Sequence, residues 1–462
     1  MTGAQPDSMP TSIPQSMDAD TFVDGLALNR FHIIVIALCT LLTAIDGYEL
    51  YVVGWVLPLL AKDFHVAPAA VTAAMIAQQT GMLIGAFLIP PFADRLGRPR
   101  VLLICYAGMM VAALGILTAH TLPVFAAWRF FAGLCGTAMI PILVTIASET
   151  APKRLRGTMS AITVSGTMLG SLFGAIMQAV VLEPFGWRGA FWIAAALPAI
   201  MLPLVHFLLP ESLRARAGRN PDDPAIQTLA RAMQPRGAPP VTIVATPRPA
   251  QTGGATKALV AEILGPDMRV RTLLMWAITI SSFVFITAGV WKTTIFKEVL
   301  GLSWQMVAAV NATETTAGVL GTLSIGFFID RLGFKRVMVA TFLTAALGCA
   351  LIGVTAPGPL MFVALVMLGM CQHGGQAGVA ALAAALYPSR YRATGVGWAY
   401  GAGRVASIFA PLFGAFVLSE GFGAAGIFAM LALPLASAGL FSLWLMSLNG
   451  APRIQRAALA HG

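Results

Sequence analysis

Several charged residues lie inside long apolar stretches of this sequence, where a charge is costly unless it is paired or used. Asp46 and Glu49 stand three residues apart, so a helix would place both carboxyl groups on one face. Two neighbouring carboxyl groups in a low-dielectric environment hold a proton more tightly than one alone. Arg129 and Arg404 each carry a planar guanidinium group, which can bind a carboxylate through two hydrogen bonds. These residues predict reversible protonation beside an organic anion or, alternatively, a structural ion pair such as Asp46 with Arg129.

Three more polar residues in the apolar stretches are candidates for contacts with a small molecule. Glu314 could face a cavity or join a hydrogen-bond network. His373 and Gln376 stand about one helical turn apart, so they could contact one ligand together. A single histidine on a helix is more often a packing residue, and that reading stays open for His373.

The sequence lacks the short motifs that indicate an enzyme. It has no phosphate-binding Gly-Lys loop and no nucleophile with a neighbouring base. No His/Cys cluster has the spacing of metal ligands, and the cysteines fall in apolar segments as small buried side chains. We therefore predict no enzymatic activity, no bound metal and no cofactor.

The composition indicates a protein that is embedded in a lipid membrane. Of 462 residues, 58% are hydrophobic and only 10% are charged. A soluble domain carries roughly 25% charged residues, so this chain could not cover its surface against water. The net charge of +10 does not indicate nucleic-acid binding, because the basic residues form short clusters between apolar stretches.

The apolar stretches can form twelve spanning helices, because each needs about 20 apolar residues. We expect an all-α membrane protein with a disordered tail (1–30), a six-helix bundle (31–210), a linker (211–270), a second six-helix bundle (271–447) and a final tail (448–462). The approximate spans are 33–60, 69–92, 101–118, 122–147, 158–182, 187–209, 272–296, 303–328, 337–355, 359–386, 395–418 and 422–446.

Lys and Arg residues gather in the loops on one side of the predicted helices. This bias places those loops in the cytoplasm, together with both termini and the linker. The basic residues on this side include Arg95, Arg98, Arg100, Lys153, Arg154, Arg156, Arg331, Lys335, Arg336, Arg390, Arg392, Arg453 and Arg456.

The two groups of six helices repeat each other at a fixed offset of 236 residues. The loop Asp94-Arg95-Leu96-Gly97 recurs as Asp330-Arg331-Leu332-Gly333, and Gln78 has Glu314 as its counterpart. A second loop keeps the same register, since Pro152, Arg154, Arg156 and Thr158 recur as Pro388, Arg390, Arg392 and Thr394. Two loops in one register predict parallel six-helix repeats, with a substrate site between the halves near the middle of the membrane.

Several of these motifs resemble the major facilitator superfamily over most of the chain. The loop from Asp94 to Arg100 is similar to that superfamily's signature between its second and third helices. The fourth-helix pattern and the end of the sixth helix are also similar, through Arg129, Gly133, Gly136, Glu149, Pro152, Arg156, Gly157 and then Pro210-Glu211-Ser212. This resemblance implies the major facilitator fold and transport by alternating access.

Within that superfamily, the first helix resembles the aromatic acid:proton symporters. Asp46-Gly47-Tyr48-Glu49 is similar to their Asp-Gly-x-Asp motif, with a longer acid at its last position. The stretch Arg392-Ala393-Thr394-Gly395 and the pair Gly403-Arg404 resemble their tenth and eleventh helices. The resemblance implies import of a small aromatic carboxylate, such as a hydroxybenzoate, with protons across a bacterial inner membrane by a protein that functions as a monomer.

We expect the motif residues to divide into two sites. Asp46 and Glu49 would hold the proton, Arg129 or Arg404 would bind the substrate carboxylate, and Glu314, His373 and Gln376 would add contacts. A cytoplasmic gate, or alternatively a set of plain topology signals, would comprise Asp94, Arg95, Gly97, Arg98, Glu149, Asp330 and Arg331. Glu149 is the expected partner of the basic residues in this gate.

Other classes of membrane protein stay open at this point. A symporter of aliphatic acids would use the same charges, and a drug:proton exporter shares the fold. Exporters carry a Gly-rich fifth-helix motif with a proline, whereas 166–175 contains none and places Gly166, Gly170 and Gly174 on one flank for close helix packing. A non-transporting sensor would usually bring a folded soluble domain, and neither the tail nor the linker looks able to fold alone.

Overall fold

The computed structural model describes residues 15–136, 139–220, 222–234, 241–244, 262–266, 268–387 and 392–448. Within these residues, ten helical stretches are long and apolar enough to span a membrane. Helix α15 (Trp304–Thr355) has 52 residues, which at about 1.5 Å per residue far exceeds a bilayer core of about 30 Å. It is broken at Gly333, where φ is 79°, and the stretch Lys153–Leu208 is broken in the same way at Gly186. When each of these two broken stretches is counted as two spans, the ten stretches give twelve crossings, which agrees with the predicted number.

The remaining helices follow the predicted spans closely. The first half contains α2 (Arg30–Asp63), α3 (Thr72–Leu88), α4 (Pro90–Leu96), α5 (Arg98–Leu117), α6 (Leu122–Gly136), α7 (Met139–Thr150), α8 (Arg156–Met177) and α9 (Glu183–Leu208). The second half contains α13 (Arg269–Ala288), α14 (Lys292–Thr294), α15, α16 (Leu360–Leu386), α17 (Arg392–Ser419) and α18 (Ala424–Ser447). Short helical turns occupy Pro68–Val71, Lys153–Leu155, Gln178–Leu182, Gly289–Trp291 and Ile295–Val299.

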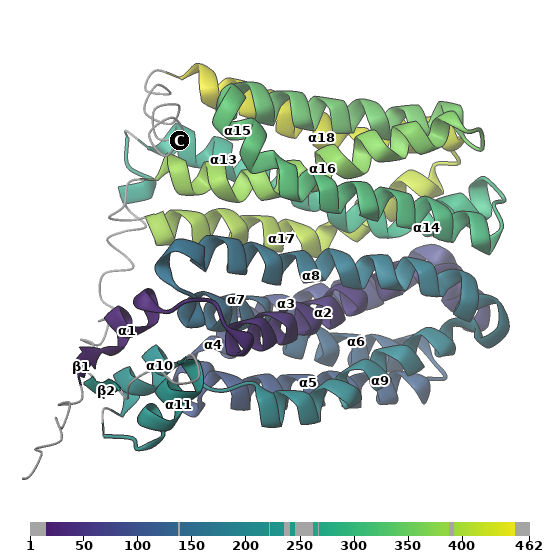
Figure 1. Cartoon of the computed structure of the whole chain (residues 1–462). Helices are drawn as coiled ribbons and strands as arrows, with labels where there is room; N and C mark the ends of the chain where they lie inside the picture. Colours follow the sequence, from purple (N-terminus) through teal and green to yellow (C-terminus); the bar gives the residue numbers. More distant parts are fainter. Residues whose placement is uncertain are drawn as a thin grey trace, which may run out of the picture.

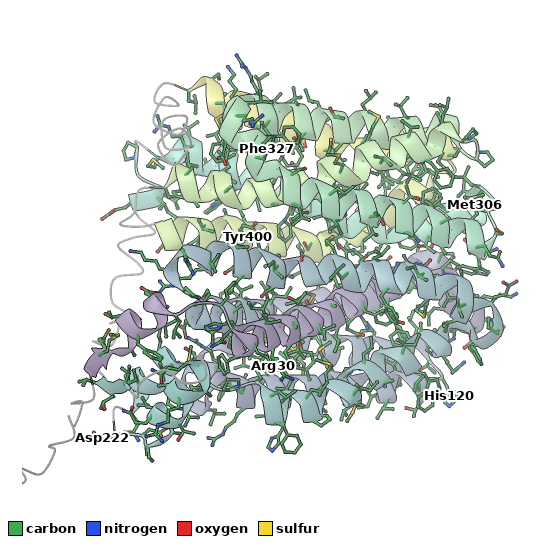
Figure 2. All side chains as sticks on the ribbon, viewed as in Figure 1. Arg30, His120, Asp222, Met306, Phe327 and Tyr400 are labelled. Carbon is green, nitrogen blue, oxygen red and sulfur yellow. The ribbon has the colours of Figure 1, made fainter. Side chains whose placement is uncertain are left out.

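The two halves lie side by side with their long helices roughly parallel (Figure 1). The contact surface between the two halves is called the seam. Across it, α8 packs against α15 and α3 packs against α17, while α2 contacts α14. Figure 2 shows Asp222 of the linker at one end of the bundle, and His120 and Met306 at the opposite end. The seam therefore runs along the helices from one end of the bundle to the other.

Glycines at matching positions make the same helix crossing in each half. A Cβ on Gly133 of α6 would overlap the carbonyl oxygen of Gln78 on α3, and a Cβ on Gly369 of α16 would overlap that of Glu314 on α15. The members of these two pairs stand 236 residues apart, which is the offset of the loop motifs. The same correspondence holds for a second pair of contacts. A Cβ on Gly85 would overlap the carbonyl oxygen of Leu134, and a Cβ on Gly321 would overlap that of Met370. The predicted repeat is thus confirmed in the packing of the helices.

A second close crossing joins α2 to α8. A Cβ on Gly166 would overlap the carbonyl oxygen of Thr40, and one on Gly170 would overlap that of Ala44. Gly47 of α2 makes the reciprocal approach to the backbone of Thr167. The glycine flank therefore lets the two backbones touch, as the sequence predicts.

Residues 15–25 of the N-terminal tail pack against the linker. Strand β1 (Gln15–Asp18) pairs in parallel with β2 (Val241–Val244), α1 (Ala19–Gly25) lies beside α10 (Leu213–Arg219), and α11 (Ala225–Met233) lies beside α10 and β2. The prediction of disorder is therefore wrong for residues 15–25. The physical reason is a small shared core, in which apolar side chains of the tail and the linker cover each other, including Phe22, Val23, Leu213, Ile226 and Met233. Residues 1–14, 235–240, 245–261 and 449–462 lie outside the described residues.

Asp24 of α1 ties this small unit to the transmembrane helices. Its carboxylate is bonded to Arg156, at the start of α8, and it accepts a hydrogen bond from Arg214 at 2.7 Å. The side-chain amide of Asn29 also donates to the carbonyl oxygen of Met233 at 2.6 Å. The tail and the linker are thus attached to the first half of the protein.

The glycine crossings lead to a stability prediction. Gly369→Ala should lower the melting temperature of the detergent-solubilised protein by several degrees, because the new methyl group overlaps the backbone of α15 and overpacking costs about 1–3 kcal/mol. The matched control is Gly397→Ala in α17, where an added Cβ meets no atom within 4 Å. Equal melting temperatures for the two variants would contradict the close crossing.

Candidate functional site

Helix α2 carries two acids into the centre of the protein, where each faces a different arginine. Asp46 and Glu49 are 6% and 7% exposed. Both lie on the buried side of the helix, as their spacing predicts, but their surroundings differ. Glu49 is bonded within the first half, whereas Asp46 faces the second half.

Glu49 forms a buried ion pair with Arg129 of α6. The guanidinium of Arg129 is fully buried, donates to the Glu49 carboxylate, and donates to the carbonyl oxygen of Glu49 at 3.1 Å. The ring of Phe191 lies 5.8 Å from the guanidinium carbon. The partner of Arg129 is therefore Glu49 and not Asp46, and the pair joins α2 to α6 within one half.

Asp46 and Arg404 face each other across the seam between the halves. Their charges interact, and the charge of Arg404 also interacts with Tyr400, one turn earlier on α17. Neither Asp46 nor Arg404 makes a side-chain hydrogen bond to another residue in the part of the chain that the structure describes. The two charges therefore interact without a direct hydrogen bond between them.

A third acid, Glu314 on α15, pairs with a lysine that the sequence analysis missed. The ammonium of Lys292 on α14 donates to the Glu314 carboxylate, and the two side chains are 16% and 7% exposed. Lys292 stands inside the predicted span 272–296, so a complete count of charges in the apolar stretches would have found it. The second half thus contains its own buried ion pair.

A cavity of about 60 Å³ lies between the two halves beside this pair. The first half contributes Tyr51, Trp55 and Ser171 to its wall, and the second half contributes polar and aromatic residues that include Phe285, Lys292, Asn311, Glu314, Gln372 and His373. A neighbouring cavity shares Tyr51 and is lined by Gln78, Gln79 and Thr287. An occupant of these cavities would touch both halves at once.

The structure separates the two polar residues predicted on α16. His373 lines the larger cavity and interacts electrostatically with Glu314 and Lys292, while Gly318 leaves room for its ring. Gln376 instead accepts a hydrogen bond from the hydroxyl of Ser282 on α13 at 2.5 Å. Tyr51, Asn311 and Gln372 also line the cavity, and sequence reasoning could not find them because polar side chains of these types are common in apolar helices.

The expected gate residues lie at the end of the bundle that carries the linker. Arg98 forms a two-bond ion pair with Glu149, the expected partner, and the amide of Arg98 donates to Glu211 at 3.2 Å. Gly97 adopts φ 97°, which permits the sharp turn between α4 and α5. These contacts join α5 and α7 within the first half and do not cross the seam.

The corresponding loop of the second half has different surroundings. Asp330 and Arg331 are exposed, and the guanidinium of Arg331 lies 4.2 Å from the centre of the Phe327 ring. Arg95 is exposed, and the side chain of Asp94 lies outside the described part of the structure.

Direct hydrogen bonds cross the seam away from the linker. Asn311 donates to Gln178 at 3.1 Å, and Gln305 donates to Glu183 at 3.1 Å. Gln178 and Glu183 follow the end of α8 that is remote from Arg156, so these bonds lie at the end opposite the tail and the linker. A weaker bond of 3.4 Å joins Gln79 to Thr287 beside the smaller cavity.

Comparisons with known proteins agree with this architecture. A family model described as "Major Facilitator Superfamily" matches residues 39–324 and 274–460. The chain is 30% identical to a "Gallate transporter" of Pseudomonas putida, covering 92% of this chain and 94% of the relative. It is 28% identical to a "4-hydroxybenzoate transporter PcaK" of Acinetobacter baylyi, covering 92% of this chain and 93% of the relative.

Solved structures show the same fold. The xylose transporter XylE from E. coli, in a partially occluded inward open conformation, matches with a TM-score of 0.69 and 17% identity. The match covers 92% of this chain and 99% of that one.

The two acids of α2 should differ in their effect on stability. Glu49→Gln leaves the charge of Arg129 buried without its partner, so we expect a loss of roughly 3–5 kcal/mol and a clear drop in melting temperature. Asp46→Asn makes the same chemical change on the same helix and removes the charge that balances Arg404, but it breaks no hydrogen bond to a described residue, so it should lower the melting temperature less. Similar drops for both variants would contradict the assignment of partners.

Proposed function

This chain belongs to the Major Facilitator Superfamily, and from that premise we propose that it is a secondary active transporter of a small aromatic carboxylate, driven by protons. The observation that carries the proposal is the cavity between the halves. Aromatic side chains from both halves line it, Tyr51 and Trp55 on one side and Phe285 on the other, and charged groups lie beside them. Flat aromatic walls suit an aromatic ring, which gains from offset or edge-to-face contacts.

The charges around the seam support coupling of the anion to a proton. When Asp46 is ionised, it balances Arg404, and the seam holds no spare positive charge for a substrate. When Asp46 takes a proton, Arg404 is left with a positive charge in a poorly solvated place, where a carboxylate is a favourable partner. Proton binding would then favour anion binding, which is the requirement for symport.

The ion pair of Glu49 and Arg129 has a different part in this proposal. The charge of Arg129 is already paired with Glu49, so of the two arginines we assign the substrate carboxylate to Arg404. Glu49 keeps a titratable carboxyl one turn from Asp46 and can share the proton site only when Arg129 releases it. Gln376 accepts a hydrogen bond from Ser282 and, unlike His373, is not among the residues that line the cavity.

The relatives point to the same class of substrate. The printed names of the matched relatives include transporters of gallate and 4-hydroxybenzoate, both small aromatic acids. We propose that this chain imports such an acid across a bacterial inner membrane as a monomer, with both termini and the linker in the cytoplasm. The excess of Lys and Arg in the loops at the linker end supports this orientation.

We assign the gate at the cytoplasmic mouth to the loops around Asp94 and Asp330. The pair of Arg98 with Glu149, and the bond from Arg98 to Glu211, hold the cytoplasmic ends of the first half together as one body. The hydrogen bonds that cross the seam at the far end support a conformation closed on the outer side. Opening on that side requires those bonds to break while each half keeps its own ion pair.

Transport by reconstituted protein tests this proposal. We expect proteoliposomes with an inward proton gradient to accumulate labelled 4-hydroxybenzoate or 3,4,5-trihydroxybenzoate, and the accumulation to vanish when a protonophore collapses the gradient. Equal accumulation of aliphatic acids would remove the aromatic specificity. A protein that moves no acid under either gradient direction would overturn the proposal.

The role of Asp46 can be separated from substrate binding. Asp46→Asn should abolish accumulation driven by the proton gradient while keeping exchange of labelled for unlabelled substrate, because exchange needs no net movement of protons. The control is Asp63→Asn at the outer end of α2, where the acid contacts Arg188 and Trp187 away from the cavity. Normal gradient-driven uptake by Asp46→Asn would remove this residue from the proton role.

A further inference from the structure

The pair of Lys292 and Glu314 lies in the wall of the cavity, and no part of the proposed coupling uses it. The two groups balance each other, so the pair adds no net charge to the cavity. A carboxylate placed here would leave two negative groups around one lysine, at a high cost in a poorly solvated place. The substrate carboxylate is better placed at Arg404, whose charge is free once Asp46 is protonated.

A neutral group that both donates and accepts hydrogen bonds fits the pair without this cost. A phenolic hydroxyl can donate to the Glu314 carboxylate and accept from the Lys292 ammonium. The surroundings are suited to such a group, because the charge of Glu314 also acts on the hydroxyl of Tyr51 across the seam. Hydrogen bonds to charged groups are stronger than those between neutral groups.

A second observation points to a polar ligand at the same place. Gln372 is 1% exposed, lines the cavity, and its side-chain nitrogen has no hydrogen-bond acceptor among the described residues. A buried amide donor without a partner is costly, so a ligand oxygen in the cavity would stabilise it. Lys292, Glu314 and Gln372 thus offer donors and an acceptor to one small group.

The spacing along α2 relates this cluster to the carboxylate site. Asp46 lies five residues before Tyr51, which corresponds to a rise of about 7.5 Å along the helix and a rotation of about 140° around its axis. A benzene ring that carries a carboxylate and a hydroxyl on opposite carbons spans a distance of this order. In this arrangement the hydroxyl lies near Lys292 and the ring beside Tyr51, both in the cavity wall, and the carboxylate points toward Arg404, which lines neither cavity.

We propose that Lys292, Glu314 and Gln372 form a subsite that recognises ring hydroxyl groups and so selects hydroxylated aromatic acids over plain benzoate. The inference rests on the proposed function, because it concerns the other end of the same substrate. It assigns a role to Lys292 and Gln372, and it makes Glu314 a determinant of specificity.

Substrate exchange in proteoliposomes tests the subsite without a proton gradient. The kcat/KM values of benzoate and 4-hydroxybenzoate are compared for the wild type and for the double variant Lys292→Gln/Glu314→Gln, which removes both charges together. The kcat/KM for 4-hydroxybenzoate divided by that for benzoate should fall about tenfold or more in the double variant. Arg404→Gln should instead raise the KM of both acids by similar factors and keep the ratio.

The outcomes separate this inference from the proposed function. An equal fall for both acids in the double variant, or an unchanged ratio, would overturn the subsite while leaving aromatic transport in place. A wild type that exchanges no aromatic acid would overturn the proposed function itself. Gln372→Leu provides a second variant that leaves both charges in place, and it too should lower the ratio; if neither variant lowers it, the subsite is wrong.

Discussion

The cost of a charge in an apolar interior is the constraint on which the rest of this structure depends. The described helices carry three acids in the middle of the protein, and each faces a basic group: Glu49 faces Arg129, Glu314 faces Lys292, and Asp46 faces Arg404. Each of the first two pairs lies within one half and is bonded directly. The third lies across the seam and makes no hydrogen bond to a described residue, so it is the pair that can be changed most readily by a proton or an anion.

Because each half contains one of the two bonded ion pairs, the halves can act as separate bodies. A half that keeps its own ion pair can move as a body, because neither of the two bonded pairs is broken when the seam opens; of the three pairs, only Asp46 and Arg404 are then separated. Glycine crossings at matched positions hold the helices of each half together through backbone contacts. The seam depends on weaker contacts, such as the amide hydrogen bonds of Asn311 and Gln305. Strong contacts within halves and weak contacts between them suit a transporter that works by alternating access.

The two repeats share the same helix packing but carry different polar side chains at equivalent positions. Gly133 and Gly369 support the same crossing, yet they press on Gln78 in one half and on Glu314 in the other. Ser282 stands 236 residues after Asp46 and is therefore its counterpart in the second half. Ser282 is hydrogen-bonded to Gln376, whereas Asp46 faces an arginine. The two halves thus carry unlike polar groups at matching positions of the repeat.

The sequence by itself predicted the apolar spans and the two parallel repeats, because apolar length, loop charge and the 236-residue register can be counted along the chain, and its loop and first-helix motifs carried the resemblance to the family. It also marked Asp46, Glu49, Arg129, Glu314 and Arg404, since charges in apolar stretches are visible in any sequence. Only the tertiary structure decided that Arg129 belongs to Glu49, that Lys292 belongs to Glu314, and that Tyr51 and Gln372 face a common cavity. It also showed that tail residues 15–25 fold against the linker. These pairings depend on the rotation of each helix about its axis and on contacts between segments far apart in the chain, which no local pattern specifies.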